Sequence, residues 1–301
     1  MQTRSVDVAI IGSGSAGLYA LSQVRRARKS CVLINGGEQG TTCARVGCMP
    51  SKAMIQVADD FHRRGHFGKY GISGREKLRL DPGEAMEHVQ GLRDLFVERV
   101  LSHSTDKLGD EFIEDYARFI EPTLLEAGGQ QIRATRVIIA TGSRPLVPVA
   151  WQAFGERIIT TDDFFEQESL PASMGVIGLG TIGLELGQSL QRFGVTVTGF
   201  DQLDTIGGLQ DPEAARMAIE VLGRELPLHL GHPATLTQDG DRLKITAGEH
   251  DVTVDQVLCS IGRVPNVQNL GLENLGIELD EHGLPAVNPA TMQIADLPVF
   301  M

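Results

Sequence analysis

The 301-residue sequence predicts an α/β fold with two Rossmann-like domains, each built on a three-layer sheet arrangement. An apolar strand runs into Gly-x-Gly-x-x-Gly and a helical pattern at residues 6–17 and again at 174–183. A second strand follows each helix, at residues 30–34 and 195–200. The length also suits roughly two domains of about 150 residues each. Two such units imply two dinucleotide sites.

In the first unit the glycines allow close approach of a pyrophosphate, which rests on the helix N-terminus. The apolar positions from Gly17 to Val24 then share one helix face, which predicts packing on the sheet. Asn35 ends the second strand, where an acid usually holds the ribose, so we expect a ribose hydrogen bond without charge assistance. The predicted contact residues of this turn are Gly12, Gly14, Ser15, Ala16 and Gly17.

The second unit repeats the pattern, with predicted contact residues Gly178, Gly180, Thr181, Ile182 and Gly183. The helix after this turn is predicted to bury one stripe of side chains. The stripe contains Ile182, Glu185, Leu186, Ser189, Leu190 and Phe193. A buried carboxylate there needs a partner, and Lys52 is the best candidate. The alternative places Glu185 at the edge of the stripe, in contact with water.

Cys43 and Cys48 follow the first unit and predict a redox-active thiol–disulfide pair. On a regular helix, residues five apart are separated by about 7.5 Å of rise, whereas a disulfide needs Cα atoms closer together. We therefore expect a tight turn at Gly47, with Cys48 just before a helix whose first turn holds Pro50. That position favours the thiolate.

A structural disulfide or half of a zinc site are the alternatives for this cysteine pair. The zinc alternative needs two further ligands. Cys31 and Cys259 lie in apolar strand-like runs and are predicted to be core residues instead. We therefore expect no metal site.

The composition indicates which classes of partner are unfavourable and which cell compartment suits the protein. A formal net charge of −12 and a pI near 5.1 disfavour nucleic acid and anionic membranes as partners. No apolar run reaches the length of a membrane span. The first strand begins at Val6, which leaves no room for a signal peptide, and four cysteines suit a reducing compartment. We expect a cytoplasmic protein.

The motifs together resemble the class I pyridine nucleotide–disulfide oxidoreductases, most closely those of dihydrolipoamide dehydrogenase type. They cover nearly the whole chain in family order, at residues 12–17, 43–52, 138–145, 178–185 and 260–266. The resemblance implies FAD and a nicotinamide dinucleotide as cofactors and a homodimer as the full-length protein. It assigns substrate exchange to Cys43, flavin contact to Cys48, and a place near the flavin to the Lys52–Glu185 pair. Further cofactor contacts fall at Thr42, Lys52, Ala140, Thr141, Gly142, Gly262 and Arg263.

The resemblance also suggests the domain organisation. Residues 1–147 and 281–301 are assigned to an incomplete FAD-binding domain and residues 148–280 to an NAD(P)-binding domain. Helices are expected at 50–65 and 81–108, and a small β region at 116–137. The tail at 285–301 should return to the first domain. The family's C-terminal dimerisation domain is absent from this chain, so we expect a fragment that is inactive alone and binds FAD weakly.

The resulting hypothesis is an FAD-dependent enzyme that oxidises a small-molecule or lipoyl-domain dithiol with NAD⁺ through a Cys43–Cys48 disulfide. NAD is favoured over NADP because no arginine lies between Arg192 and Arg216 and Asp201 would repel a 2′-phosphate. At the end of the second strand, Gly199 is expected to occupy the position at which NAD-preferring members carry an acid. The alternatives are a mercuric reductase-like or glutathione reductase-like flavoenzyme, or a non-catalytic dinucleotide-binding fragment.

Overall fold

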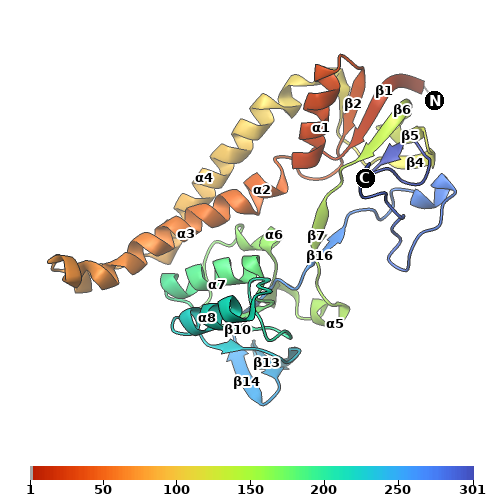
Figure 1. Ribbon diagram of the computed structural model, residues 1–301. Coiled ribbons are helices and arrows are strands. Elements are labelled where there is room, and N and C mark those ends of the chain that lie inside the picture. Colours follow the sequence, from red (N-terminus) through yellow and green to blue (C-terminus); the bar gives the residue numbers. More distant parts are fainter. Residues whose placement is uncertain (1–2) are drawn as a thin grey trace. The chain divides into compact units, whose positions relative to one another are not determined.

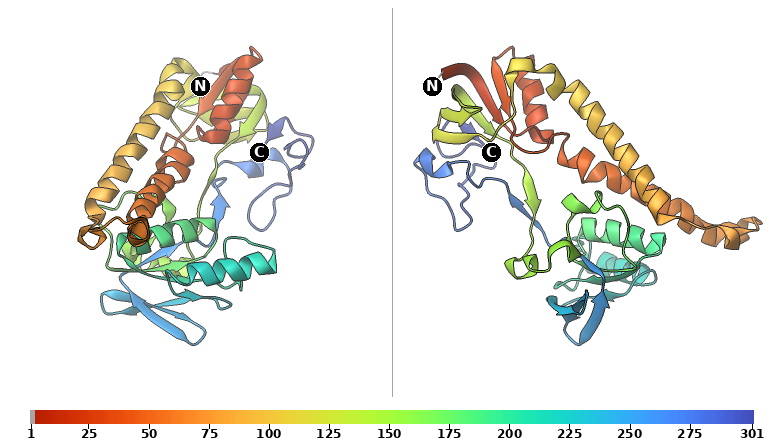
Figure 2. Two further views of the ribbon diagram at one scale, coloured as in Figure 1. Left: turned by 60° about the vertical axis from the view of Figure 1, so that its left-hand side comes forward. Right: turned by 180° about the vertical axis from the view of Figure 1, so that it is seen from behind.

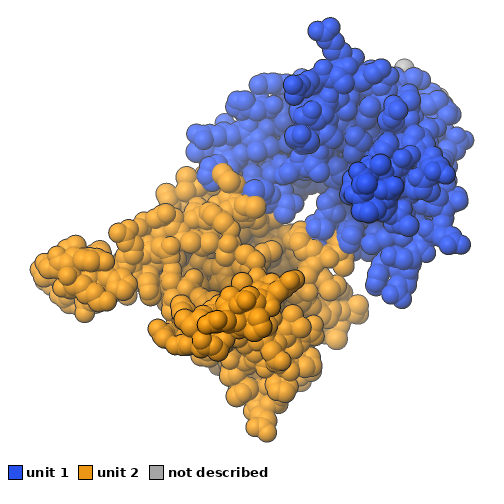
Figure 3. Space-filling view, viewed as in Figure 1, with its two compact units in different colours: residues 1–45, 95–144, 265–301 blue, residues 46–94, 145–264 orange. Residues whose placement is uncertain are grey.

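The computed structural model describes residues 3–301, which form two compact units (Figures 1 and 3). The first unit comprises the chain as far as Arg45 together with residues 95–144 and 265–301. The second unit comprises residues 46–94 and 145–264. The chain therefore passes between the units four times along its length.

The first unit is built on a seven-stranded sheet whose centre is β1 (Thr3–Ile11). The strands on both sides of β1 run parallel to it, and two more strands extend the sheet in antiparallel fashion. The parallel neighbours are β2 (Cys31–Ile34), β3 (Phe112–Ile113), β6 (Gln130–Ile139) and, beside the end of β6, β17 (Val299–Phe300); the antiparallel pair is β5 (Leu124–Ala127) and β4 (Arg118–Glu121). The pairing of β17 with β6 returns the tail to this sheet, as predicted.

Apolar residues cover both faces of the first sheet. On one face, α1 (Ser15–Arg26) packs Leu21 against Ile10 and Leu33. On the other face lies the segment from Val267 to Ile294, which includes the 3-10 helix η6 (Leu272–Leu275). The alternation of side chains along β1 separates these two cores, because successive strand residues point to opposite faces.

The second unit repeats this plan with a five-stranded, fully parallel sheet in the order β11-β10-β9-β15-β8. Its central strand is β9 (Ser173–Ile177), as β1 is in the first unit. The other strands are β8 (Ile158–Ile159), β10 (Thr196–Phe200), β11 (Leu228–His229) and β15 (Gln256–Cys259). A separate antiparallel sheet consists of β12 (Thr235–Asp239), β13 (Arg242–Ala247) and β14 (His250–Val254).

The parallel sheet of the second unit lies between helices and the antiparallel sheet. On one face, α7 (Thr181–Phe193) buries Leu186 and Leu190 against Val176. On the other face Ile245 of β13 approaches so closely that a Cβ on Gly175 would lie 2.1 Å from its Cδ1 atom. These layers confirm the predicted α/β fold with two Rossmann-like, three-layer units.

A long helical hairpin, shown in Figure 2, precedes the small β region. It consists of α3 (Cys48–His62), the 3-10 helices η1 (Arg63–Tyr70) and η2 (Arg75–Lys77), and α4 (Pro82–His103). Met54 of α3 and Met86 of α4 share a core with Leu186 of α7. The division into two compact units reflects this packing. The domains expected from the sequence, in contrast, are defined by the cofactor that each should bind. The cofactor assignment of residues 1–147, 148–280 and 281–301 therefore stays a prediction.

The remaining elements are short. They are α2 (Thr42–Arg45), η3 (Thr105–Lys107), η4 (Gly109–Glu111), β7 (Ser143–Pro145), α5 (Val149–Gln152), η5 (Gly155–Arg157), α6 (Thr161–Phe164), α8 (Pro212–Leu222) and β16 (Arg263–Pro265). Strands β7 and β16 pair with each other where the chain leaves and re-enters the first unit.

Arg192, near the end of α7, holds three parts of the second unit together. Its Nε and Nη2 atoms donate to the two carboxylate oxygens of Glu225, each at 2.8 Å, and Nη1 pairs with Asp59 of α3. The side chains of Arg192 and Glu225 are only 14% and 20% exposed. The hydrogen bond from Arg192 lowers the pKa of Glu225, since it stabilises the charged carboxylate.

Replacing Arg192 with Met is therefore expected to lower the free energy of unfolding by about 1.5–3 kcal/mol at neutral pH. The matched variant Arg224→Met removes a 69%-exposed arginine paired with Glu220 and should cost no more than about 0.5 kcal/mol. Because the folded-state pKa of Glu225 is lowered, the Arg192 contribution is present above the ordinary value of 4.5 and is lost as pH falls through the folded value. Urea unfolding at several pH values checks both statements; equal losses in the two variants would contradict the network.

Candidate active site

The first glycine turn joins β1 to α1 and has two tight contacts. Gly12 has a φ of +108°, and a Cβ there would lie 2.2 Å from the carbonyl oxygen of Ala140. A Cβ on Gly17 would lie 1.8 Å from the carbonyl oxygen of Gly12. A Cβ on Gly14, in contrast, would meet nothing within 4 Å. Gly12 and Gly17 are thus required by the fold, while Gly14 leaves the backbone at the start of α1 accessible to a ligand.

The second turn, between β9 and α7, has the same geometry. Gly178 has a φ of +93°, and its Cβ would lie 2.5 Å from the carbonyl oxygen of Ser260. A Cβ on Gly183 would lie 2.0 Å from the carbonyl oxygen of Gly178, whereas a Cβ on Gly180 would meet nothing within 4 Å. Ser15 and Ala16 in the first unit, and Thr181 and Ile182 in the second, are exposed at the corresponding helix starts. Both turns therefore present free helix N-termini of the kind that bind pyrophosphate.

Ile182 corrects one expectation about α7. The sequence pattern places Ile182 in the buried stripe, but the residue is 43% exposed. It lies in the first turn of the helix and is not part of the core that buries Leu186 and Leu190.

In each unit, the side chain of a residue just after the second strand accepts a hydrogen bond from the glycine turn. The amide of Ser13 donates to Oδ1 of Asn35 at 3.1 Å, and the amide of Leu179 donates to Oδ2 of Asp201 at 2.6 Å. Each pair spans 22 residues. Asp201 is therefore the counterpart of Asn35, and the expectation that Gly199 occupies this position is wrong. Gly199 lies inside β10, where a Cβ would press on Leu179 at 2.9 Å.

The family motif at residues 138–145 is held to the motif at 260–266 through Asn266. The Asn266 side chain donates to the carbonyl oxygen of Thr141 at 3.1 Å, and its amide donates to that of Gly142 at 2.9 Å. Arg144 completes the arrangement by donating to Oδ1 of Asn266 at 3.1 Å. Ala140, which packs on the first glycine turn, donates its amide to the carbonyl of Ile11 at 2.7 Å.

The second-unit end of the same motif also has specific contacts. Gly262 has a φ of +132°, a conformation that favours glycine. Arg263 lies 3.7 Å from a carboxylate oxygen of Asp162 and donates to the hydroxyl of Thr161 at 3.4 Å. The predicted cofactor residues of this motif are therefore ordered by polar contacts within their own unit.

Lys52 and Glu185 form the expected ion pair between α3 and α7. The Lys52 Nζ atom lies 2.7 Å and 2.6 Å from the two carboxylate oxygens of Glu185. The expectation of a buried pair is wrong, because the Lys52 and Glu185 side chains are 59% and 29% exposed. Met54 and Leu186 fill the centre of the helix contact, which leaves the ion pair at its edge. The role of the pair near a flavin stays a prediction.

The two cysteines of the predicted redox pair lie on successive helices. Cys43 is half-buried in α2 of the first unit, and Cys48 is the exposed first residue of α3 in the second unit. Cys48 thus starts the helix rather than preceding it, and the Ser51 hydroxyl donates to its carbonyl at 3.2 Å. The residues with positive φ are Gly40 and Thr41, at +102° and +66°, whereas Gly47 has a φ of −129°. The disulfide itself stays a prediction.

Cys31 and Cys259 are core residues, as predicted. Burial raises the pKa of both thiols, that of Cys259 to about 11. The Cys259 thiol donates to the carbonyl oxygen of Leu146 at 3.3 Å. Within residues 3–301, no three His, Cys, Asp or Glu side chains are grouped so that they could hold a metal ion. In the same range, no helix combines the length and apolar character needed to cross a bilayer.

The duplicated glycine turns have the geometry that is typical of dinucleotide-binding proteins. Residues 6–300 match the family model described as pyridine nucleotide-disulphide oxidoreductase. The chain belongs to this family of oxidoreductases.

Similar proteins agree with this assignment. Dihydrolipoyl dehydrogenase of Thermus scotoductus is 30% identical over 297 residues, which cover 95% of this chain and 63% of that protein. Dihydrolipoyl dehydrogenase 3 of Pseudomonas aeruginosa is 30% identical over 304 residues, covering 93% and 63%. The Cu(II) complex of the HOCl-induced flavoprotein disulfide reductase RclA from Escherichia coli shares the fold, with a TM-score of 0.84 and 20% identity over 99% of this chain and 65% of that one. The chain thus spans less than two thirds of the length of these relatives.

The first glycine turn predicts different effects on stability for two nearby glycine-to-alanine substitutions. Gly17→Ala should lower the free energy of unfolding by about 1–3 kcal/mol, because its methyl group overlaps the Gly12 carbonyl. Gly14→Ala has a compatible φ of −72° and open space, so it should change stability by less than about 0.5 kcal/mol. Chemical unfolding without added dinucleotide measures both. Equal destabilisation would show that the second glycine is also required by the fold.

A second expectation concerns the exposed Lys52–Glu185 pair. Solvent screens such a pair, so a double-mutant cycle of Lys52→Met and Glu185→Gln should give a coupling free energy of roughly 0.2–1 kcal/mol. A buried pair would cost about 3–5 kcal/mol when one partner is removed. Thermal or urea unfolding of the four proteins distinguishes these values, and a large coupling would mean that the pair is shielded in solution.

Proposed function

We propose that the chain is the dinucleotide-binding part of an FAD-dependent disulfide oxidoreductase of dihydrolipoamide dehydrogenase type, which oxidises a dithiol with NAD⁺. The observation that carries the proposal is the pair of equivalent glycine turns, with Cys43 and Cys48 following the first of them. Family membership and the dihydrolipoyl dehydrogenase relatives support it. A homodimeric assembly and a cytoplasmic location belong to the same proposal.

The residues of the first turn fit FAD. The open side of Gly14 and the exposed start of α1 leave main-chain N–H groups for a pyrophosphate, and Asn35 stands where a ribose hydroxyl is held. The carbonyl oxygen of Ala140 and the Cα atom of Thr141 lie against Gly12 of this turn. Gly142, Thr42 and Lys52 are proposed as further contacts from the family motifs. FAD, when bound, supplies the two-electron chemistry that connects a dithiol with a nicotinamide.

The cysteines carry the thiol chemistry. In the oxidised enzyme, a substrate thiolate attacks the Cys43 sulfur, the Cys43–Cys48 bond breaks, and Cys48 leaves as a thiolate. The second substrate thiol then attacks the substrate sulfur of this mixed disulfide. The substrate leaves as a disulfide, and Cys43 is released as a thiol. Two electrons have passed from the dithiol to the cysteine pair. One of the two substrate protons ends on the Cys43 thiol, and the other is released to solvent.

Lys52 is proposed as a positioning residue in this scheme. Glu185 receives hydrogen bonds from the Lys52 ammonium on both carboxylate oxygens and so fixes its location at the start of α3. Lys52 lies in the same helix as Cys48. A fixed positive charge there favours a negatively charged sulfur nearby.

Cys48→Ser is expected to abolish the long-wavelength absorption of a thiolate beside the flavin, whereas Cys43→Ser retains it. The reason is that Cys48 starts a helix and occupies the position that contacts flavin in the family. Visible spectra of the reduced proteins, with the flavin-to-protein ratio measured in each, provide the test. The reverse pattern would exchange the two roles. A colourless protein that takes up no added FAD would contradict the proposed flavoenzyme.

NAD⁺ is proposed over NADP⁺ because of Asp201. Its two carboxylate oxygens accept hydrogen bonds from the amides of Leu179 and Leu203, at 2.6 Å and 2.9 Å, which orient the group at the end of β10. A carboxylate there binds ribose hydroxyls and repels a 2′-phosphate.

Asp201→Asn keeps an oxygen for the Leu179 amide but loses the charge. NAD⁺ affinity should fall by about tenfold to a hundredfold, which corresponds to the loss of a charged hydrogen bond of about 1.5–3 kcal/mol. NADP⁺ affinity should fall less or rise. Calorimetric titration of both dinucleotides with wild type and variant, and with Asp204→Asn as a neighbouring control, gives the ratio. An unchanged ratio would exclude Asp201 from cofactor selection.

A further inference from the structure

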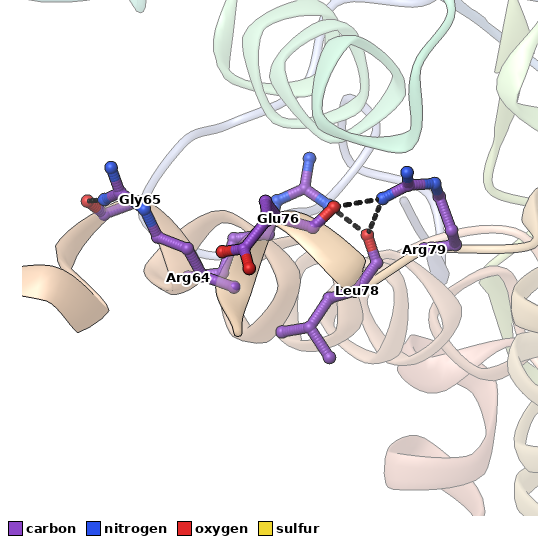
Figure 4. A pocket seen from close by; sticks show the side chains of 6 residues that line it. Arg64, Gly65, Glu76, Leu78 and Arg79 are labelled. Atoms are coloured by element: carbon purple, nitrogen blue, oxygen red, sulfur yellow. Dashed lines mark hydrogen bonds between the residues drawn. The ribbon is translucent and has the colours of Figure 1, made fainter. Parts of the chain in front are cut away.

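The turn between α3 and α4 contains a small pocket whose lining is rich in arginine. Its cavity measures about 230 Å³. Figure 4 shows the side chains around it. The lining residues, termed here the arginine pocket, are Arg64, Gly65, Arg75, Glu76, Leu78 and Arg79. None of them belongs to the glycine turns or to the cysteine segments.

The charge around the arginine pocket is opposite to that of the whole chain. Residues 62–80 contain six Lys or Arg residues and one acid, Glu76, in a chain whose formal net charge is −12. Such a local excess of positive charge attracts anions against the overall field of the protein. Leu78, which lines the pocket, is 44% exposed, so the pocket opens to the surface.

Main-chain carbonyl groups hold the three guanidinium groups in place. Arg75 donates to the carbonyl of Gly65 at 2.7 Å, and Arg79 donates to those of Glu76 and Leu78 at 2.6 Å and 2.9 Å. Arg64 donates to the Leu78 carbonyl at 3.2 Å and lies 3.4 Å above the ring of Phe61. These contacts use one terminal nitrogen of each guanidinium, which leaves other N–H groups for a ligand.

The three arginines also have no acidic partner. Within residues 3–301, neither Arg64 nor Arg75 nor Arg79 forms an ion pair, although Glu76 lines the same pocket. With Glu76 included, the lining carries a formal charge of +2. Fixed guanidinium groups without a counter-charge are suited to a planar, bidentate contact with an oxyanion.

We propose that the arginine pocket binds a phosphoryl group. A phosphate monoester carries about 1.5 to 2 negative charges at neutral pH, which matches the charge of the lining. The cavity is smaller than the roughly 300–1,000 Å³ of pockets for drug-sized ligands, so it suits a single group of this size. The phosphoryl group could belong to a free phosphorylated compound or to a lipid headgroup, and both present the same terminal oxygens.

The test uses arginine modification by phenylglyoxal in the full chain, read for each arginine by peptide mass spectrometry. This readout separates the arginine pocket from the glycine turns, which are proposed to bind the phosphates of the dinucleotides. Inorganic phosphate should slow modification of Arg75 and Arg79 several-fold, relative to chloride at the same ionic strength. Arg63 and Arg99, which lie outside the pocket, serve as internal controls and should react equally in both salts.

Two variants extend the test. Arg79→Lys keeps the charge but loses the planar pair of donors, so phosphate should no longer protect Arg75. Lys77→Gln removes a nearby charge outside the pocket and should leave the protection intact. Circular dichroism confirms that both are folded, and the wild-type protection pattern decides the matter independently of the variants.

Sedimentation with phosphatidylcholine vesicles, with and without phosphatidic acid, identifies the source of the phosphoryl group. Binding that requires phosphatidic acid and is lost in Arg79→Lys indicates a lipid headgroup. Protection by inorganic phosphate without vesicle binding indicates a free phosphorylated compound. The proposal is wrong if inorganic phosphate does not protect Arg75 and Arg79 and no vesicle binding depends on both phosphatidic acid and Arg79. It is also wrong if phosphate protects Arg63 to the same extent as Arg75 and Arg79.

Discussion

The close approach of each helix start to its glycine turn is the constraint on which both units depend. In the first unit the backbone of Gly17 lies against the carbonyl of Gly12, and in the second Gly183 lies against that of Gly178. Neither contact leaves space for a methyl group. The approach brings the start of the helix onto its sheet and leaves the first N–H groups of the helix at the open turn. Core packing and ligand access thus follow from the same pair of backbone contacts.

The sequence predicts the features that local pattern alone determines. Both turns, the apolar face of α1 and the burial of Cys31 and Cys259 follow from spacing and residue type. The partnership of Lys52 with Glu185 follows from the need of a carboxylate in an apolar stripe for a counter-charge, supported by the family pattern. The exposure of the pair cannot be predicted from the sequence, because it depends on which residues of α3 and α7 face each other in the folded chain.

Other features depend on contacts between distant segments. The prediction that Gly199 is the counterpart of Asn35 is wrong, because β10 extends one residue further, to Phe200. The spacing between the glycine turn and the residue after the second strand is the same in both units. The separation of Asn35 from Gly12 therefore identifies Asp201. The partners of Arg192 are harder to predict from the sequence. The acid within α7 is Glu185, which pairs with Lys52, and Asp59 and Glu225 lie far from Arg192 in the sequence. The arginine pocket forms from residues on both sides of a chain reversal, so only the folded hairpin brings them together.

The order in which the segments of the two units alternate has a consequence for synthesis on the ribosome. All segments of the second unit have been made once residue 264 is complete, whereas the first unit still lacks residues 265–301. Until then, one face of its sheet lacks Leu270, Ile294 and Val299, and β6 lacks its partner β17. The apolar face is thus exposed on a nascent chain, the kind of intermediate that favours aggregation and engages chaperones. The part of the chain made first is the last to complete its core.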